Sequence, residues 1–277
     1  QASEGEQNPG VPPPSEVSPQ SLGFTDIVED SDSVLRRHLL AMAPAEPCDT
    51  DKSFSFQLAQ RYLAKENIEL QLNPEENSFS DSKKFVLPYL ESNSGSYSNI
   101  DSLGYQVMLN WRSTPEIANR IDLQQVLDGK IQSNLVKDKI VIIGTTAPSF
   151  NNYWLTPLSP ATSEQNKTPG VAIHAHMVSQ IISAALDNRP LLWVWSKWTE
   201  ALWIYCWAIV GAMLACRFKS SLHLALTLGL TQIVLYLICY SILIQGGWIP
   251  FIPCVFALIA SSGSVAIYKK KKTPLLN

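Results

Sequence analysis

The chain has 277 residues, of which 21 are basic and 24 acidic, so its formal charge is −3. The charge is unevenly divided, because residues 1–192 carry 14 basic and 23 acidic side chains while the remainder carries 7 and one. An acidic first part argues against a nucleic-acid partner, which needs basic patches, and against tight docking onto anionic lipid. Its single cysteine, Cys48, excludes an internal disulfide in this part.

The first 20 residues are rich in Pro, Glu, Ser and Gly and predict a loop. The chain begins at Gln1 without the charged segment and following apolar stretch of a signal peptide. We therefore expect that an export signal or another membrane span precedes this sequence in the complete protein.

Residues 22–42 predict two strands joined by a turn at residues 30–33, where Asp and Ser side chains bond their own backbone. Residues 53–67 show helical periodicity, with Ser53 or Ser55 as the capping residue. The side chains predicted to share one face of this helix are Phe54, Leu58, Ala59 and Tyr62.

Residues 71–102 are polar and predict a surface insertion with one strand-like piece at residues 85–90. Residues 105–112 alternate between apolar and polar side chains, as a half-buried strand does. The apolar face of this strand consists of Val107, Leu109 and Trp111. Residues 121–130 then predict a short helix that ends at Gly129.

The segment KIVIIGTT, residues 139–146, is an apolar run ending in a glycine turn and is typical of a strand buried on both faces. Residues 170–188 predict an amphipathic helix. The apolar stripe of that helix consists of Ile173, Met177, Ile181 and Ala185. Strands mixed with helices predict an α/β domain over residues 1–190.

Three long apolar segments follow within residues 191–268, at about residues 199–216, 221–244 and 248–268. Each is long enough to cross a hydrocarbon core of about 30 Å as a helix, the conformation that satisfies the backbone inside lipid. The alternative is the buried helical core of a soluble protein, but such helices rarely run this long without a charge.

Basic residues give these spans a direction. Arg217 and Lys219 lie between the first and second spans, and four lysines at 269–272 follow the third, whereas the connection between the second and third spans is uncharged. The positive-inside rule then places the tail, residues 269–277, in the cytoplasm and residues 1–192 outside the plasma membrane. The outer border carries a predicted aromatic belt of Trp193, Trp195 and Trp198. The predicted fold class is an α/β extracytoplasmic domain followed by three transmembrane α-helices.

The turn at residues 143–149 follows the predicted buried strand, and such turns can cradle a phosphate. It lacks the second and third glycines of a dinucleotide fingerprint and the Gly-Lys-Ser/Thr of a P-loop. A tight exit from the strand is therefore the preferred interpretation, and no cofactor is predicted.

His174 and His176 lie two residues apart, so on a helix they face different directions and do not form the i, i+4 pair of a metal site. No Cys, Asp or Glu accompanies them at ligand spacing. We expect that one of them bonds backbone at the start of its helix, and we predict no metal site.

Asp30, Asp32, Arg36 and Arg37 form a dense charged group. Two neighbouring carboxylates could perform acid–base chemistry, but a turn that pairs its carboxylates with the following arginines is the preferred interpretation. No nucleophile elbow and no Ser/His/Asp set is present, so no catalytic residue is assigned.

Lone Glu200 beside Lys197 at the membrane border predicts an interfacial ion pair rather than a transport residue. Residues 166–168 fit a glycosylation sequon, which matters only in a eukaryotic secretory pathway. Small residues in the spans permit close helix packing and a possible homodimer. These residues are Gly211, Ala215, Ala260 and Ser264.

Taken in order, several segments resemble the type-two CHASE domain, the cyclase/histidine-kinase-associated sensory extracellular domain. They are LGFTDIVEDSDSVLRRHLL (22–40), SFSFQLAQRYL (53–63), IDLQQVLDGKI (121–131), LVKDKIVIIGTTAPS (135–149) and PGVAIHAHMVSQII (169–182). The sequence departs from the family pattern at Ser33, where Gly is usual, and at residues 151–157, which lack the usual Asp before Thr-Pro.

The resemblance implies a bacterial extracytoplasmic sensor, usually preceded by one span, followed by three, and coupled to a kinase, a cyclase or another effector. We therefore expect a membrane-bound sensory module that detects a small molecule or a protein ligand. Its effector is expected upstream of Gln1 or on another chain. A membrane-anchored enzyme of the outer face and a transporter component remain the alternatives.

Overall fold

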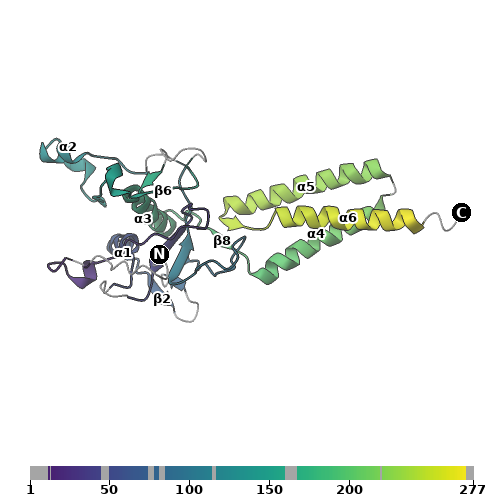
Figure 1. Ribbon diagram of the computed structural model, residues 1–277, viewed down its shortest axis with the longest axis horizontal. Helices are drawn as coiled ribbons and strands as arrows, with labels where there is room; N and C mark the ends of the chain where they lie inside the picture. The colour runs from purple at the N-terminus through teal and green to yellow at the C-terminus, as the bar shows by residue number, and fades with distance from the viewer. Residues whose placement is uncertain are drawn as a thin grey trace. The chain divides into compact units, whose positions relative to one another are not determined.

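The computed structural model describes residues 12, 14–44, 50–73, 78–80, 85–113, 117–159, 167–218 and 220–272. The chain divides into two compact units (Figure 1). The first, here called the α/β unit, comprises Gln1–Leu90 and Asp101–Leu191; the second, the helical unit, comprises Glu91–Ile100 and Leu192–Asn277. A mixed α/β region followed by three long apolar helices confirms the predicted fold class.

The α/β unit combines short antiparallel sheets with α-helices. Its described elements are η1 (Pro19–Ser21), β1 (Arg37–Ala41), α1 (Phe54–Lys65), β2 (Gln71–Asn73), β3 (Ser78–Ser80), β4 (Val86–Leu87), β5 (Tyr105–Met108), α2 (Leu123–Leu127), η2 (Ser133–Leu135), η3 (Pro148–Phe150), β6 (Tyr153–Trp154), β7 (Thr168–Pro169) and α3 (Gly170–Leu186). β1 pairs with β5, β3 lies between β2 and β4, and β6 pairs with β7.

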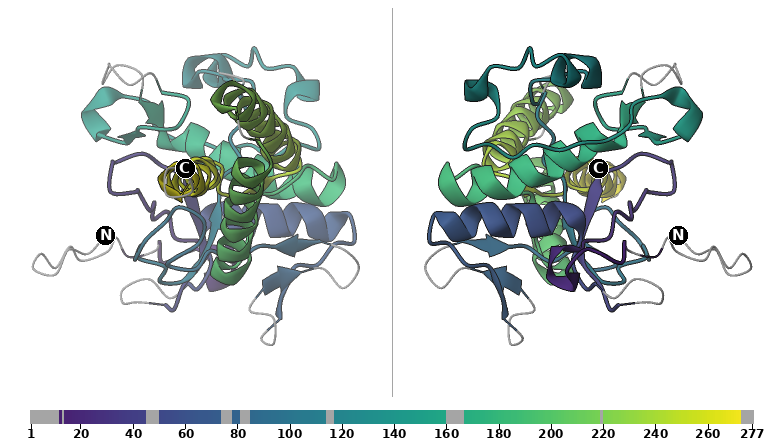
Figure 2. Two further views of the ribbon diagram at one scale, coloured as in Figure 1. Left: turned by 90° about the vertical axis from the view of Figure 1, so that its right-hand side faces the viewer. Right: turned by 90° about the vertical axis from the view of Figure 1, so that its left-hand side faces the viewer.

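The main core forms where α1 and α3, which lie side by side (Figure 2), pack with these strands. Its buried members are Leu40, Phe56, Ala59, Leu63, Leu70, Phe79, Leu87, Tyr105, Val107 and Ile181. A second cluster consists of Leu35, Leu109, Ile173 and Met177. The predicted stripe of α3 is confirmed, because Ile173, Met177 and Ile181 are buried and Ala185 is partly buried against the core.

Helix α1 forms where the periodicity placed it. The Ser53 side chain accepts a hydrogen bond from the amide of Phe56 at 3.3 Å, so Ser53 is the N-cap. The predicted face is wrong, however, because of its four residues only Ala59 is buried. Phe56 turns inward instead, with its ring edge against Phe79, while Phe54 meets His174 at the rim.

The predicted turn at residues 30–33 is confirmed. The Ser33 amide donates to the carbonyl of Asp30 at 2.9 Å, and Ser33 has φ of +60°, in the left-handed region that favours glycine. Of the two predicted strands around the turn, only β1 forms. The segment before the turn makes one isolated bridge, Phe24 with Ser53, and has no strand beside it among the described residues.

Residues 71–102, expected as a surface insertion, contribute more to the core than their polarity indicates. They supply β2, β3 and β4, and the side chains of Phe79, Leu87 and Leu90 are buried. The Tyr105 hydroxyl donates to the carbonyl of Leu87 and accepts from the amide of Phe79, so this small sheet is bonded to β5. Alternation within strands of two or three residues is too short to reveal such burial.

The predicted buried strand at residues 139–146 is absent. This segment forms no strand, and Ile143 is 91% exposed. No strand lies beside it among the described residues, and an extended segment cannot pair its backbone alone. The short helix before it, α2, is confirmed, with Gly129 at φ of +65° just beyond its end.

The helical unit contains α4 (Lys197–Arg217), α5 (Ser221–Ile244) and α6 (Ile252–Lys272), with β8 (Trp193–Val194) and β9 (Gly247–Trp248) at one end. The three helices are long and apolar enough to cross a membrane. The second matches its predicted bounds, whereas the third begins at Ile252 because Trp248 pairs within β9.

Helices α4 and α6 pack closely because small residues let their backbones approach. A Cβ added to Gly211 would lie 2.3 Å from the carbonyl oxygen of Leu258, and Ala215 is 1% exposed. These two residues, considered for a dimer, therefore act inside the chain, whereas Ala260 and Ser264 are exposed.

Candidate functional site

The charged turn of the α/β unit pairs its two carboxylates with the arginines that follow them. Arg36 contacts Asp30 at 2.9 Å and Asp32 at 2.8 Å, and Arg37 contacts Asp30 at 2.7 Å. The hydrogen bond from Arg36 lowers the pKa of Asp32 to about 2, so this carboxyl group remains ionised at neutral pH. The predicted pairing is confirmed, and a carboxylate held in this way is unsuited to general acid catalysis.

Arg37 connects this turn to the rest of the unit. Its side chain is 4% exposed and donates to the carbonyls of Glu29 at 2.7 Å and Asp101 at 2.8 Å, and to the amide oxygen of Gln106 at 2.9 Å. A buried guanidinium with this many partners fixes the groups around it. Asp101 is thereby held, and it is the residue at which the chain returns from the helical unit.

The segment Glu91–Ile100, here called the linking loop, lies between two parts of the α/β unit in sequence but belongs to the helical unit. Its shape is maintained from within, because the amide of Glu91 donates to Ser94 Oγ at 2.9 Å and the amide of Asn99 donates to Asn93 Oδ1 at 3.0 Å. Sequence reasoning assigned these residues to a surface insertion and missed this attachment.

Gly95 and Tyr97 hold the linking loop against β8, β9 and the start of α4. Gly95 has φ of +56°, and a Cβ there would lie 3.0 Å from the Trp248 ring and 3.1 Å from Val194. The Gly95 carbonyl accepts a hydrogen bond from Lys197 Nζ at 2.5 Å. Tyr97 meets Trp248 edge to face, with ring centroids 6.0 Å apart.

Lys197 also pairs with Glu200 at 3.2 Å, which confirms the predicted ion pair. Glu200 is 8% exposed, so its carboxylate is held near the start of α4, where the helix dipole also favours it. The linking loop, α4 and Glu200 therefore share one lysine.

Strands β8 and β9 close this end of the bundle. They are parallel, with Trp193 opposite Gly247, and the Trp193 amide donates to the carbonyl of Gly246 at 2.9 Å. The predicted aromatic belt is divided: Trp198 is 87% exposed, whereas Trp195 packs on Trp203 with centroids 5.6 Å apart.

The histidines of the α/β unit fill packed positions. His174 Nδ1 lies 2.7 Å from Ser55 Oγ, so the expected bond to backbone is wrong, and His176 packs on Trp111. Burial lowers the pKa of both imidazoles to about 4. Within the described part of the chain no three His, Cys, Asp or Glu side chains gather as a metal site would require.

The turn at residues 143–149 is explained by packing. A Cβ at Gly144 would lie 2.8 Å from the Cβ of Val171, so glycine permits this turn to approach the start of α3. Asn166 of the sequon lies outside the described residues.

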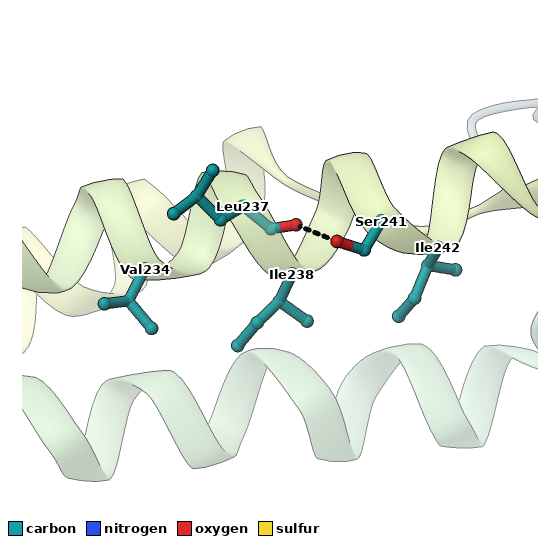
Figure 3. Close-up of a pocket in the computed structure, with 5 residues that line it drawn as sticks. All are labelled: Val234, Leu237, Ile238, Ser241 and Ile242. Carbon is teal, nitrogen blue, oxygen red and sulfur yellow. Dashed lines mark hydrogen bonds between the residues drawn. The ribbon is translucent and has the colours of Figure 1, made fainter.

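A hollow of about 310 Å³ runs along α5. It is lined by Val234, Leu237, Ile238, Ser241 and Ile242, of which Val234, Ile238 and Ile242 point toward the neighbouring helix (Figure 3). Ser241 donates to the carbonyl of Leu237 in its own helix, so the hollow offers an apolar surface suited to lipid chains or another helix.

The comparison with protein families decides what kind of module this is. The family model of the CHASE2 domain matches residues 2–213. The chain belongs to the CHASE2 family. This is a family of sensory domains rather than of enzymes, and the match extends through most of α4. No curated protein and no solved structure matches this CHASE2 chain.

Proposed function

We propose that this CHASE2 protein is a membrane sensor whose α/β unit detects a small molecule or a protein ligand. It transmits the bound state through α4, α5 and α6 to an effector that residues 1–277 do not contain. Such transmission requires a ligand with different affinity for two states of the protein.

The linking loop carries this proposal. The chain passes between the two units at three places, after Leu90, after Ile100 and after Leu191. A change in the α/β unit therefore acts on the helical unit through both ends of the linking loop as well as through the segment leading to α4. Arg37, which holds Asp101 and the charged turn together, controls one of these ends.

We propose that the α/β unit lies outside the plasma membrane and the tail lies in the cytoplasm. Lys269 Nζ donates to the carbonyls of Ala215 at 3.0 Å and Cys216 at 2.6 Å, so the end of α6 meets the end of α4. Lys269 and Arg217 thus lie at the end of the bundle opposite β8 and β9, as the positive-inside rule requires of a cytoplasmic end.

Hydrogen exchange of the protein in lipid nanodiscs tests the transmission. Arg37→Gln removes the donor to Asp101, so we expect faster exchange in the linking loop and at the Trp193 amide. Arg36→Gln is the matched control, because the Arg36 side chain bonds Asp30 and Asp32 and no other group among the described residues. Near-ultraviolet circular dichroism confirms that both variants are folded.

A second variant carries its substitution in the helical unit. Lys197→Met removes the bond to Gly95, and coupling between sites is reciprocal, so exchange at the Leu90 amide should also rise. If each variant alters exchange only within its own unit, transmission through the linking loop is rejected.

A further inference from the structure

Two arginines of the α/β unit have no role in the charged turn or the linking loop. Arg112 follows β5 and Arg189 follows α3, and both side chains are partly buried. Neither makes an ion pair with any carboxylate that the structure describes. Asp187, the acidic residue nearest to Arg189 in sequence, is exposed and likewise has no ion pair among the described residues. Arg61 and Arg120 also lack an ion pair among the described residues, but both are exposed, so partial burial distinguishes Arg112 and Arg189.

Arg112 is held in place by hydroxyl groups rather than by a carboxylate. Its Nε donates to Ser179 Oγ at 3.2 Å and its Nη2 donates to Ser183 Oγ at 2.5 Å, and these serines lie one turn apart on α3. A guanidinium has five N–H donors, so three remain for another acceptor.

Arg189 is also held by hydrogen bonds to neutral groups. Its Nη2 donates to the carbonyl of Asn110 at 2.8 Å, and its amide donates to the carbonyl of Ser183 at 3.1 Å. Asn110 is itself held, because its amide donates to Gln180 Oε1 at 2.7 Å and its side-chain nitrogen donates to the carbonyl of Pro190. Both arginines are therefore pre-positioned by the same stretch of α3.

The charges of this group repel each other. Burial and then the charge of Arg112 lower the pKa of Arg189, and burial followed by the charges of Arg189 and Arg112 lowers the pKa of His176 to about 4. Trp111 Nε1, next to Arg112 in sequence, is buried without a hydrogen-bond partner among the described groups. A bound anion would relieve the repulsion and accept the free donors.

We propose that Arg112 and Arg189 form an anion-binding site for a small molecule that carries a carboxylate or phosphate group. The planar guanidinium matches both groups through paired hydrogen bonds. That this is the ligand site of the sensor rests on the proposed function. Arg189 lies two residues before Leu191, where the chain passes to the helical unit, so a ligand there acts next to the segment that leads into α4.

Calorimetric titration of the protein in nanodiscs of neutral lipid tests the site with two probes, inorganic phosphate and succinate. We expect saturable binding of at least one probe, and the probe that binds identifies the anionic group. Arg112→Gln and Arg189→Gln should each weaken binding by roughly tenfold or more, the loss of a charge-assisted hydrogen bond. Arg120→Gln, which removes the same charge from an exposed arginine of the same unit, should leave binding unchanged.

Arg112→Lys keeps the charge but removes the planar fork, and should give an intermediate affinity. If neither probe saturates the wild-type protein, or if Arg120→Gln weakens binding as much as the other two, the site is disproved.

Hydrogen exchange with the bound probe separates this inference from the proposed function. Binding with unchanged exchange in the helical unit would support the site and contradict transmission. Absent binding together with the expected effect of Arg37→Gln would leave transmission standing and disprove the site.

Discussion

At the scale of single residues, the buried and partly buried basic side chains of the α/β unit differ in their hydrogen-bond partners. Arg37 has carboxylate and carbonyl partners, Arg112 and Arg189 have neutral ones, and His38 has almost none. His38 is 1% exposed, its Nε2 lies 3.4 Å from Ser53 Oγ, and its Nδ1 has no partner among the described groups. The folded protein accommodates a histidine in such a position only in its neutral form.

This makes stability dependent on pH. Burial lowers the pKa of His38 from 6.5 to about 3. Between these two pH values the imidazole is protonated in the unfolded state and neutral in the folded state. Stability is therefore complete above pH 6.5 and falls as the pH drops toward 3. Between pH 7 and pH 5 the loss from His38 is about 2 kcal/mol.

Urea unfolding of the α/β unit, followed by near-ultraviolet circular dichroism at several pH values, measures this loss. His38→Gln should show a shallower dependence on pH over the same range, whatever its absolute stability. An unchanged slope in that variant would assign the pH dependence to other groups.

At the scale of elements, the linking loop depends on one glycine. Gly95→Ala puts a side chain on a residue with positive φ, which is unfavourable, and places its methyl group 3.0 Å from the Trp248 ring. Gly129→Ala is the matched control, because Gly129 has φ of +65° but nothing within 4 Å of the added methyl group. We expect Gly95→Ala to cost about 1 kcal/mol more than Gly129→Ala, the additional cost of overpacking.

Hydrogen exchange at the amides of the linking loop and of β8 and β9 measures the local part of this cost. If the two alanine variants lose equal stability and exchange remains slow beside Trp248, the contact of Gly95 has no energetic role.

The close pair α4 and α6 gives a second prediction at this scale. Gly211→Ala places a methyl group 2.3 Å from the Leu258 carbonyl oxygen, so the two helices must separate, at a cost of about 1–3 kcal/mol. Gly229→Ala on α5 meets nothing within 4 Å, so it has the same gain in helix propensity without the overpacking and should not be destabilised. Thermal unfolding of both variants in the same detergent compares them, and equal melting temperatures would contradict the packing described here.

The elements that periodicity predicted well are those whose structure is decided locally. Helices α1, α3 and α4 to α6 repeat their apolar pattern over several turns, so their positions follow from the sequence. The strand expected at residues 139–146 failed because a strand needs a partner, which a local pattern cannot supply. The face of α1 failed for a related reason, since Phe79, distant in sequence, decides that Phe56 turns inward.

The candidate sites show the same division. The ion pairs of Asp32 with Arg36 and of Lys197 with Glu200 join residues three or four apart, and the sequence predicted both. The bonds from Arg37 to Asp101 and from Arg112 to Ser183 span 64 and 71 residues. Spacing along the chain carries no signal for such pairs, so only the folded arrangement reveals them.

At the scale of the whole molecule, the distribution of charge predicts a direction across the membrane. Residues 1–192 carry a net negative charge, and Lys269 at the end of α6 bonds the end of α4 beside Arg217, so basic residues meet where these two helices end. Moving that cluster across the bilayer would oppose the positive-inside rule. We therefore predict that the linking loop and the end of α6 lie on opposite sides of the membrane.

Single cysteines in a background from which all five native cysteines are removed test this orientation, because each variant then has one reactive thiol. Ser98→Cys in the linking loop and Lys270→Cys at the end of α6 both occupy exposed positions. In right-side-out membrane vesicles, an impermeant maleimide should label Ser98→Cys at once and Lys270→Cys only after the vesicles are opened. Labelling of both cysteines from the same side would overturn the orientation, and with it the assignment of the α/β unit to detection outside the cell.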